Sequence, residues 1–130
     1  MSWFYELISG RIYSATGDLI GIGYSGALEY KNRPDATSLH NLGPIPVGGY
    51  AIGEPRDTVT HGPYVLPLDP STGNIMFDRF GFLIHGDSVI SPGFSSEGCI
   101  ILSRDIREKI WTSGDRELEV LATIPNGLFT

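Results

Sequence analysis

A chain of 130 residues fits a single domain spanning residues 1–130, because a chain of this length can bury roughly two thirds of its surface around one core. Its 17 glycines and 9 prolines, with only 18% charged residues, indicate a turn-rich, mainly β protein and exclude a disordered acidic tail. The net charge of −6 and the scattered Lys and Arg residues argue against a nucleic-acid partner. The absence of an apolar window of about 18 residues argues against membrane insertion.

The first part of the chain alternates short apolar runs with glycine turns, a pattern typical of a β-meander. We expect strands within residues 3–8, 12–13 and 19–24. Residues 25–41 mix small, polar and charged side chains without a sustained apolar period. This stretch is therefore predicted to be a surface loop, either a lid or a simple connection.

A turn rich in proline and glycine, residues 41–50, leads into the middle of the chain. Short strands are predicted at residues 50–52, 64–68 and 82–85. The last of these is an apolar run that ends in a polar residue, His85, directly before a glycine. Functional groups are often found where a strand ends and a loop begins.

One helix is predicted near the C-terminus, after the apolar run at residues 100–102. Ser103 is a suitable N-cap, and Ile106 and Ile110 lie four residues apart on one helical face. Charged and apolar side chains then alternate at the start of residues 117–124, which predicts a closing strand with one buried face. The chain is therefore predicted to be mainly β, with one short helix in its C-terminal region.

The only cysteine, Cys99, lies fourteen residues after His85, and each of the two is in a glycine-flanked turn next to an apolar strand. Two such strands can lie side by side in one sheet. A thiol with its ordinary pKa of about 8.5 is only a few per cent thiolate at neutral pH, so a nucleophilic cysteine needs a base to take its proton. The pattern favours Cys99 as a nucleophile and His85 as its base.

The neighbouring glycines fit the same chemistry. Gly98 allows a substrate carbonyl to approach the backbone, and the N–H groups of Gly98 and Cys99 could point at a developing oxyanion. The Gly86 carbonyl could hold the far nitrogen of the imidazole. The alternative is structural, because a lone cysteine before Ile-Ile-Leu is often a small buried hydrophobe and a histidine at a strand end is often only hydrogen-bonded.

Three motifs resemble those of the L,D-transpeptidases of the YkuD type. The pair H-G at residues 85–86 and the run S-E-G-C-I at residues 96–100 resemble the two-part signature of that family, H-G and then S-H-G-C-[IV]. Residues 43–50 are similar to its T-P-x-G-x-Y/F turn. The phrases N-x-G-P-I-P-x-G-x-Y, F-L-I-H-G-D-S and S-x-G-C-I-I-L look most like the type VI secretion effectors of the L,D-transpeptidase class.

The resemblance implies a fold and a set of residue roles. The fold would be an L,D-transpeptidase-like β-sandwich or barrel. Cys99 would be the nucleophile, His85 the base, and the Gly86 carbonyl the group that orients the imidazole. Ser96 and Gly98 would support the catalytic loop or the oxyanion.

Two positions depart from the family pattern. Glu97 stands where the motif has histidine, and Ile101 stands where many members have arginine. The missing guanidinium leaves open how a substrate carboxylate is recognised, since arginine can bind a carboxylate through two parallel hydrogen bonds. Arg79 or Arg33 could replace it, or each could be an ordinary solvated surface charge.

Further residues are candidates for substrate contacts. Asp87 and Ser88 could shape the pocket, although an Asp-Ser turn cap is an ordinary alternative. Tyr64 could line a groove, or pack in the core as aromatic residues of short strands often do. His61 and His40 have no recognised metal-ligand spacing with the acidic residues, so neither a metal nor a cofactor is expected.

The resemblance implies an antibacterial effector enzyme. Its thiolate would attack the carbonyl of the third residue of a peptidoglycan tetrapeptide stem and expel the terminal D-Ala. Water, a free D-amino acid or another stem's amine would then release the acyl group, giving L,D-carboxypeptidase, exchange or crosslinking activity. One alternative is a catalytically inactive peptidoglycan-binding domain of the same fold. Another is a cysteine peptidase of a different fold.

The N-terminus lacks the charged start and apolar run of a secretory signal, so we expect synthesis in the cytoplasm followed by specialised secretion. The expected site of action is the periplasm of a target bacterium. The expected partners are peptidoglycan stem peptides, type VI secretion components and a cognate immunity protein that covers the Cys99 cleft.

Overall fold

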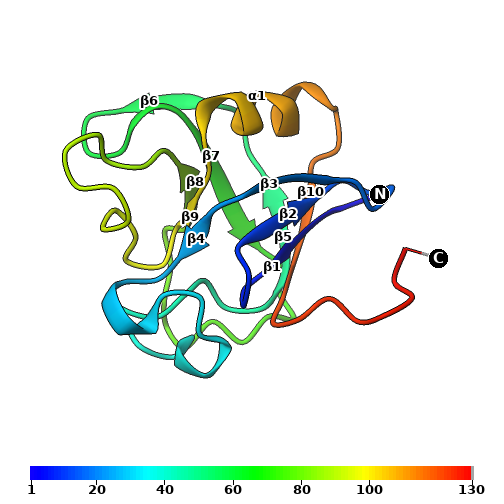
Figure 1. Cartoon of the computed structure of the whole chain (residues 1–130), viewed down its shortest axis with the longest axis horizontal. Helices are drawn as coiled ribbons and strands as arrows, with labels where there is room; N and C mark the ends of the chain where they lie inside the picture. Colours follow the sequence, from blue (N-terminus) through cyan, green and yellow to red (C-terminus); the bar gives the residue numbers. More distant parts are fainter. Residues whose placement is uncertain (130) are drawn as a thin grey trace.

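The computed structural model describes residues 1–129, so Thr130, the last residue of the predicted domain, lies outside the described part. A ten-stranded mixed sheet dominates these residues (Figure 1). The strands are β1 (Trp3–Glu6), β2 (Arg11–Tyr13), β3 (Leu19–Ile22), β4 (Tyr24–Ser25), β5 (Gly48–Ile52), β6 (Arg56–Thr58), β7 (Gly62–Pro70), β8 (Leu83–His85), β9 (Ile100–Ile101) and β10 (Glu117–Leu121). The α-helix is α1 (Arg104–Thr112), and two 3₁₀ helices are η1 (Leu28–Tyr30) and η2 (Pro34–Ala36). The predicted mainly β fold is confirmed.

The sheet curls so that its two edge strands are consecutive in the chain. The strand order is β3-β2-β1-β10-β5-β7-β8-β9-β4, with β6 paired to β7. Gly23 links the edges β3 and β4; its N–H donates to the Gly10 carbonyl (2.7 Å), and a side chain there would collide with the Ile101 carbonyl. Over residues 1–129 the ladder stays open between β3 and β4, so the expected barrel is not closed.

The core is built from apolar side chains of both halves of the sheet and of α1. On β10, Leu118 and Val120 are fully buried while the glutamates beside them face outward, as the predicted alternation requires. On α1, Ile106 and Ile110 pack into the same core. Ser103 is the N-cap, but its hydroxyl donates to the Asp105 carboxylate rather than capping a backbone N–H.

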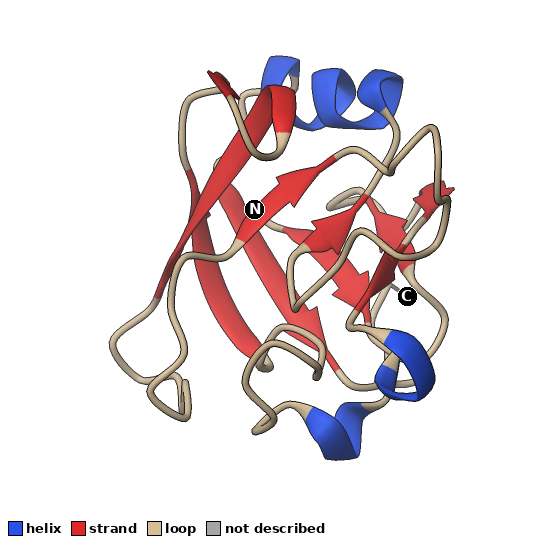
Figure 2. Cartoon of the chain, turned by 90° about the vertical axis from the view of Figure 1, so that its left-hand side faces the viewer, coloured by secondary structure: helices blue, strands red, loops and turns tan. Residues whose placement is uncertain are grey.

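Two segments differ from the sequence prediction. β6 was not predicted, because Arg56-Asp57-Thr58 has no apolar alternation; it pairs with the beginning of β7 to form a hairpin. The predicted loop 25–41 contains η1 and η2, which lie at the end of the molecule opposite α1 (Figure 2).

Within residues 1–129, every helix falls short of the length and apolarity needed to cross a membrane.

Candidate active site

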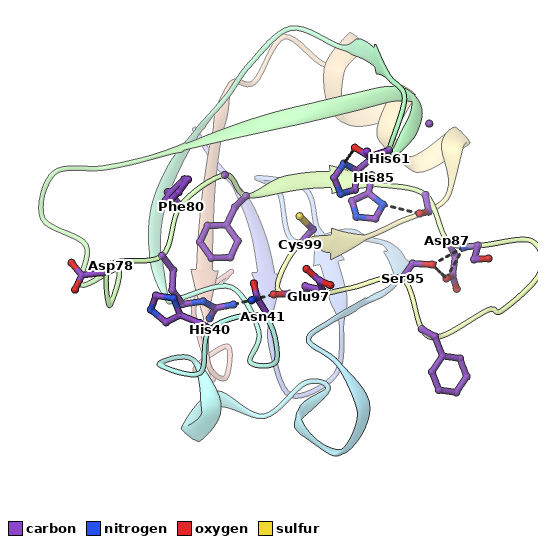
Figure 3. Close-up of a pocket in the computed structure, with 18 residues that line it drawn as sticks. His40, Asn41, His61, Asp78, Phe80, His85, Asp87, Ser95, Glu97 and Cys99 are labelled. Atoms are coloured by element: carbon purple, nitrogen blue, oxygen red, sulfur yellow. Dashed lines mark hydrogen bonds between the residues drawn. The ribbon is translucent and has the colours of Figure 1, made fainter.

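A cleft of about 810 Å³ lies where β8 and β9 meet the loops and the β6–β7 hairpin. Cys99 and Glu97 lie near its middle, between two arms (Figure 3). One arm carries His40, Asn41, Asp78 and Phe80, and the other carries His61, His85, Asp87 and Ser95. The cleft therefore extends on both sides of the thiol.

The parallel pairing of β8 and β9 brings the predicted nucleophile and base to one face. His85 pairs with Ile101, and Cys99 lies two residues before Ile101. Cys99 lies directly before β9, and its thiol and the His85 ring both face the same cleft (Figure 3). The Leu83 backbone, beside Cys99 in this register, acts to lower the pKa of the thiol.

The imidazole of His85 is oriented by the next residue. Its Nδ1 lies 2.8 Å from the Gly86 carbonyl oxygen. A carbonyl oxygen only accepts, so this geometry assigns the proton to Nδ1 and leaves the Nε2 lone pair available. Burial of the ring, which is only 3% exposed, is the main cause that lowers the pKa of His85, and the nearby His61 and Arg107 lower it further. His85 is therefore a neutral base at neutral pH.

The thiol of Cys99 is also neutral in the free protein. Burial raises its pKa to about 11, and the charge of Glu97 acts in the same direction. The Leu83 backbone bond and the charge of Arg79 oppose this rise. The resting pair is thus thiol and neutral imidazole, so the thiol would have to lose its proton to act as a nucleophile.

Ser96 holds the turn that carries Cys99. Its buried hydroxyl donates to the Cys99 carbonyl (2.6 Å) and accepts from the N–H groups of Gly98 (3.1 Å) and Gly26 (2.9 Å). The Gly98 carbonyl in turn accepts from the Ser25 hydroxyl (2.8 Å). The Gly98 N–H is therefore engaged by Ser96, in contrast to the prediction that it faces an oxyanion.

Gly98 is required by the close approach of Arg79 and by its own backbone conformation. Its φ of +134° is unfavourable for other residues, and a Cβ at this position would lie 2.5 Å from Arg79 Nη2 and 2.9 Å from Phe82 Cε1. The close packing that the glycine permits is thus internal to the protein.

Arg79 is neither the surface charge nor the free carboxylate-binding group that the sequence suggested. Its side chain is buried, and its two Nη atoms donate to four backbone carbonyls. The acceptors are Thr37 (2.6 Å), Pro44 (2.8 Å), Gly43 (2.9 Å) and Glu97 (3.2 Å). These bonds join the loop before β5 to the Cys99 turn and occupy the donors that a bidentate carboxylate contact would use.

Asp87 and Ser88 organise the loop that follows β8. The Asp87 carboxylate accepts hydrogen bonds from the Tyr24 hydroxyl (2.7 Å), the Ser95 hydroxyl (2.9 Å) and the N–H groups of Ser88 (2.8 Å) and Gly93 (3.0 Å). The Ser88 hydroxyl accepts from two further N–H groups of the loop. The structure therefore places both residues at the cleft as turn caps, the alternative considered from the sequence.

Two other candidates lie elsewhere. Tyr64 packs against the core, with the Arg104 guanidinium 4.6 Å above its ring, and Arg33 bonds the Asp35 carboxylate on the surface (2.8 Å). Among the described residues that line the cleft, neither appears, so a substrate-binding role for them stays a prediction. Ile101, at the position of the family arginine, is buried in β9.

The sequence analysis missed two residues that shape the site. The His61 ring lies 4.7 Å from the His85 ring, and the Arg107 guanidinium packs behind Gly86. Arg107 had a detectable signal, because it lies three residues before Ile110 on the apolar stripe of α1. His61 had none, because its position depends on the unpredicted β6 pairing.

In residues 1–129, no cluster of three or more His, Cys, Asp or Glu side chains could hold a metal ion.

Comparisons with known proteins identify the family. Neither the curated proteins nor the solved structures contain a match. The model of the Tlde1 domain matches residues 21–125, which include the Cys99 turn and His85. The chain therefore belongs to the Tlde1 domain family, the type VI secretion effectors of L,D-transpeptidase type.

Proposed function

We propose that this protein is a cysteine-dependent L,D-acyl transferase that acts on the tetrapeptide stems of peptidoglycan, with carboxypeptidase or D-amino-acid exchange activity. The observation that carries the proposal is the placement of Cys99 and His85 on one face of the β8–β9 pair, inside one cleft. The contact between His85 and Gly86 supports it, because it leaves Nε2 as a base. Family membership supports the same reaction class.

Acylation follows from these two groups. His85 Nε2 accepts the thiol proton while the sulfur of Cys99 bonds to the carbonyl carbon of the third stem residue. The resulting imidazolium then gives this proton to the nitrogen of the terminal D-Ala. The C–N bond breaks, D-Ala leaves, and a thioester remains on Cys99.

Deacylation runs through the same imidazole. Water or the amine of a D-amino acid bonds to the thioester carbon, His85 takes a proton from it, and the C–S bond breaks. The proton passes to the departing sulfur, which restores the thiol. Water yields a tripeptide stem, and a D-amino acid yields an exchanged tetrapeptide stem.

The test is mass spectrometry of purified disaccharide-tetrapeptide incubated with the wild type, Cys99→Ser and His85→Ala, with and without D-Met. We expect loss of D-Ala or its exchange for D-Met only in the wild type. The surface variant Arg33→Met serves as a control and should behave as the wild type does. An unchanged substrate with the wild type would contradict the proposal and favour the inactive peptidoglycan-binding domain.

The place of action and the partners belong to the same proposal. We propose delivery through type VI secretion components into the periplasm of a target bacterium, and protection of the producer by an immunity protein that covers the cleft. Expression directed to the periplasm should be toxic for the wild type and harmless for Cys99→Ala. Toxicity that survives Cys99→Ala would contradict the proposed chemistry.

A further inference from the structure

Two histidines from different elements lie ring against ring at the cleft. The ring centroids of His61 and His85 are 4.7 Å apart, and the ring planes are inclined by 52° (Figure 3). His61 belongs to the turn between β6 and β7 and is exposed, whereas only 3% of His85 is exposed. His61 therefore covers one side of the base and separates it from bulk solvent.

The turn that carries His61 is fixed by its own hydrogen bonds. The His61 N–H donates to the Thr58 hydroxyl (2.9 Å), and this hydroxyl donates to the Gly62 carbonyl (3.2 Å). The Nδ1 atom of His61 lies 2.9 Å from the Thr60 hydroxyl. These contacts hold both the backbone and the imidazole of the turn.

Arg107 of α1 links this turn to the strand end that carries His85. Its Nη1 atom donates to the carbonyls of Pro63 (3.0 Å) and Tyr64 (2.9 Å), directly after the turn. Its Nη2 atom packs so close to Gly86 that a Cβ there would lie 2.9 Å from it. One buried guanidinium thus contacts both the hairpin and the residue that orients His85, and the ring contact is a built feature of the site.

We propose that His61 is a specificity-determining residue of the acyl-enzyme, and this inference rests on the proposed function. Its ring covers His85, so that an acceptor has to reach the base from within the cleft, beside Cys99. A D-amino acid can contact the walls of the cleft with its own side chain, whereas water relies on free access to the base. The cover therefore favours exchange over hydrolysis.

Hydrolysis and exchange form and break the same kinds of bond and transfer the same number of protons. In hydrolysis, the water oxygen bonds to the thioester carbon, the C–S bond breaks, and one water proton passes through His85 to the sulfur. In exchange, the neutral amine nitrogen of the D-amino acid forms the new bond, and one amine proton follows the same route. The identity of the acceptor is the only difference, so the product ratio reports access to the base.

The experiment measures that ratio. Disaccharide-tetrapeptide is incubated with excess D-Met, and mass spectrometry quantifies the tripeptide and the D-Met-containing tetrapeptide. We expect His61→Ala to raise the ratio of tripeptide to exchanged product several-fold. His61→Phe keeps an aromatic cover and should retain the wild-type ratio. Val59→Ala, a fully exposed position beside the same turn, is the matched control and should also retain it.

A misfolded fraction would lower both products together, so the ratio is insensitive to stability. An unchanged ratio in His61→Ala would overturn the inference, as would a His61→Phe ratio equal to that of His61→Ala, because the ring nitrogens would then be responsible. A wild type that forms only tripeptide in excess D-Met would also overturn it while leaving the proposed function intact. A wild type that forms neither product would overturn the proposed function and this inference with it.

Discussion

Two turns border the cleft, and in each of them one side chain collects several hydrogen bonds. In the Cys99 turn, residues 96–99, the side chain is the hydroxyl of Ser96, which is 2% exposed. In the loop that follows β8, residues 87–95, it is the exposed carboxylate of Asp87. Several hydrogen bonds to one side chain therefore stabilise a turn once in the interior and once at the surface.

The difference in burial decides what each turn can tolerate. A buried neutral hydroxyl does not titrate, and its loss leaves buried backbone groups without partners, which costs free energy. An exposed carboxylate competes with water for its donors and changes charge in acid. Cys99, the proposed nucleophile, is therefore held by a side chain that does not titrate, whereas the outer loop of the cleft is held by a side chain that loses its charge in acid.

The largest effect is expected from Arg79→Met, which removes the guanidinium behind the Cys99 turn. Four backbone carbonyls would lose their donor, although relief of the buried charge offsets part of the loss. We expect the free energy of unfolding, measured by urea denaturation, to fall by about 2 to 3 kcal/mol. Arg33→Met removes an exposed ion pair and should change it by less than about 0.5 kcal/mol. Equal effects would refute the bonding role of Arg79.

A smaller effect is expected from Ser96→Ala, compared with Ser95→Ala next to it. Ser96 serves three buried or partly buried groups, so its loss should cost about 1 to 2 kcal/mol of unfolding free energy. Ser95 bonds Asp87 and the Ser88 N–H at the surface, so its loss should cost less than about 1 kcal/mol. Urea denaturation of both variants measures the difference. A larger loss for Ser95→Ala would reverse the comparison.

Residues with a local signal were placed well by the sequence. The apolar runs before His85 and after Cys99 predicted two strands, and Ile106 and Ile110 predicted the helix. These positions follow from side-chain periodicity, which is a property of neighbouring residues. The sequence predicted only that the two strands can lie side by side in one sheet; it did not predict their parallel register, because pairing depends on residues far apart in the chain.

The sequence misplaced residues whose surroundings come from distant segments. Arg79 is surrounded by carbonyls of the loop before β5 and of the Cys99 turn, so no local pattern predicted its burial. The Gly98 N–H was assigned to an oxyanion because the nearest alternative acceptor, the Ser96 hydroxyl, has no fixed direction in a sequence. His61 reached the site through the β6–β7 hairpin, whose polar first strand lacks an apolar period.

Asp87→Asn tests the pH response of the outer loop. Burial opposes ionisation of Asp87, but hydrogen bonds from Tyr24, Gly93, Ser95 and Ser88 outweigh it and lower the pKa below its usual value. A depressed folded-state pKa contributes stability that is present above the unfolded value of about 3.9 and is lost as the pH falls through the folded pKa. We expect Asp87→Asn to lower the free energy of unfolding by less than about 1 kcal/mol at pH 7 and to leave it unchanged at pH 2.

His85 adds a second acid-sensitive contribution to the free energy of unfolding. Because the pKa of His85 is also lowered in the folded state, this contribution is lost as the pH falls below the unfolded value of about 6.5. This contribution is not identical in the wild type and in Asp87→Asn, because the charge of Asp87 is one of the causes that raise the pKa of His85. The difference between their unfolding free energies, measured from pH 7 to pH 2, therefore reports the loss of the Asp87 charge together with this smaller change at His85. A difference that stays constant over this range would show that the carboxylate charge does not hold the loop.

The smallest effect is expected at the thiol itself, from Glu97→Gln. The Glu97 side chain is exposed in the cleft, and its charge raises the pKa of Cys99 in addition to the larger effect of burial. Removing that charge lowers the thiol pKa, so more thiolate is present at pH 8 and alkylation by iodoacetamide should be a few-fold faster. Glu29→Gln, an exposed acidic residue of η1, should leave the rate unchanged. If Glu97→Gln reacted no faster than the wild type, the charge of Glu97, the residue in place of the family histidine, would have no effect on the thiol pKa. Burial alone would then raise that pKa.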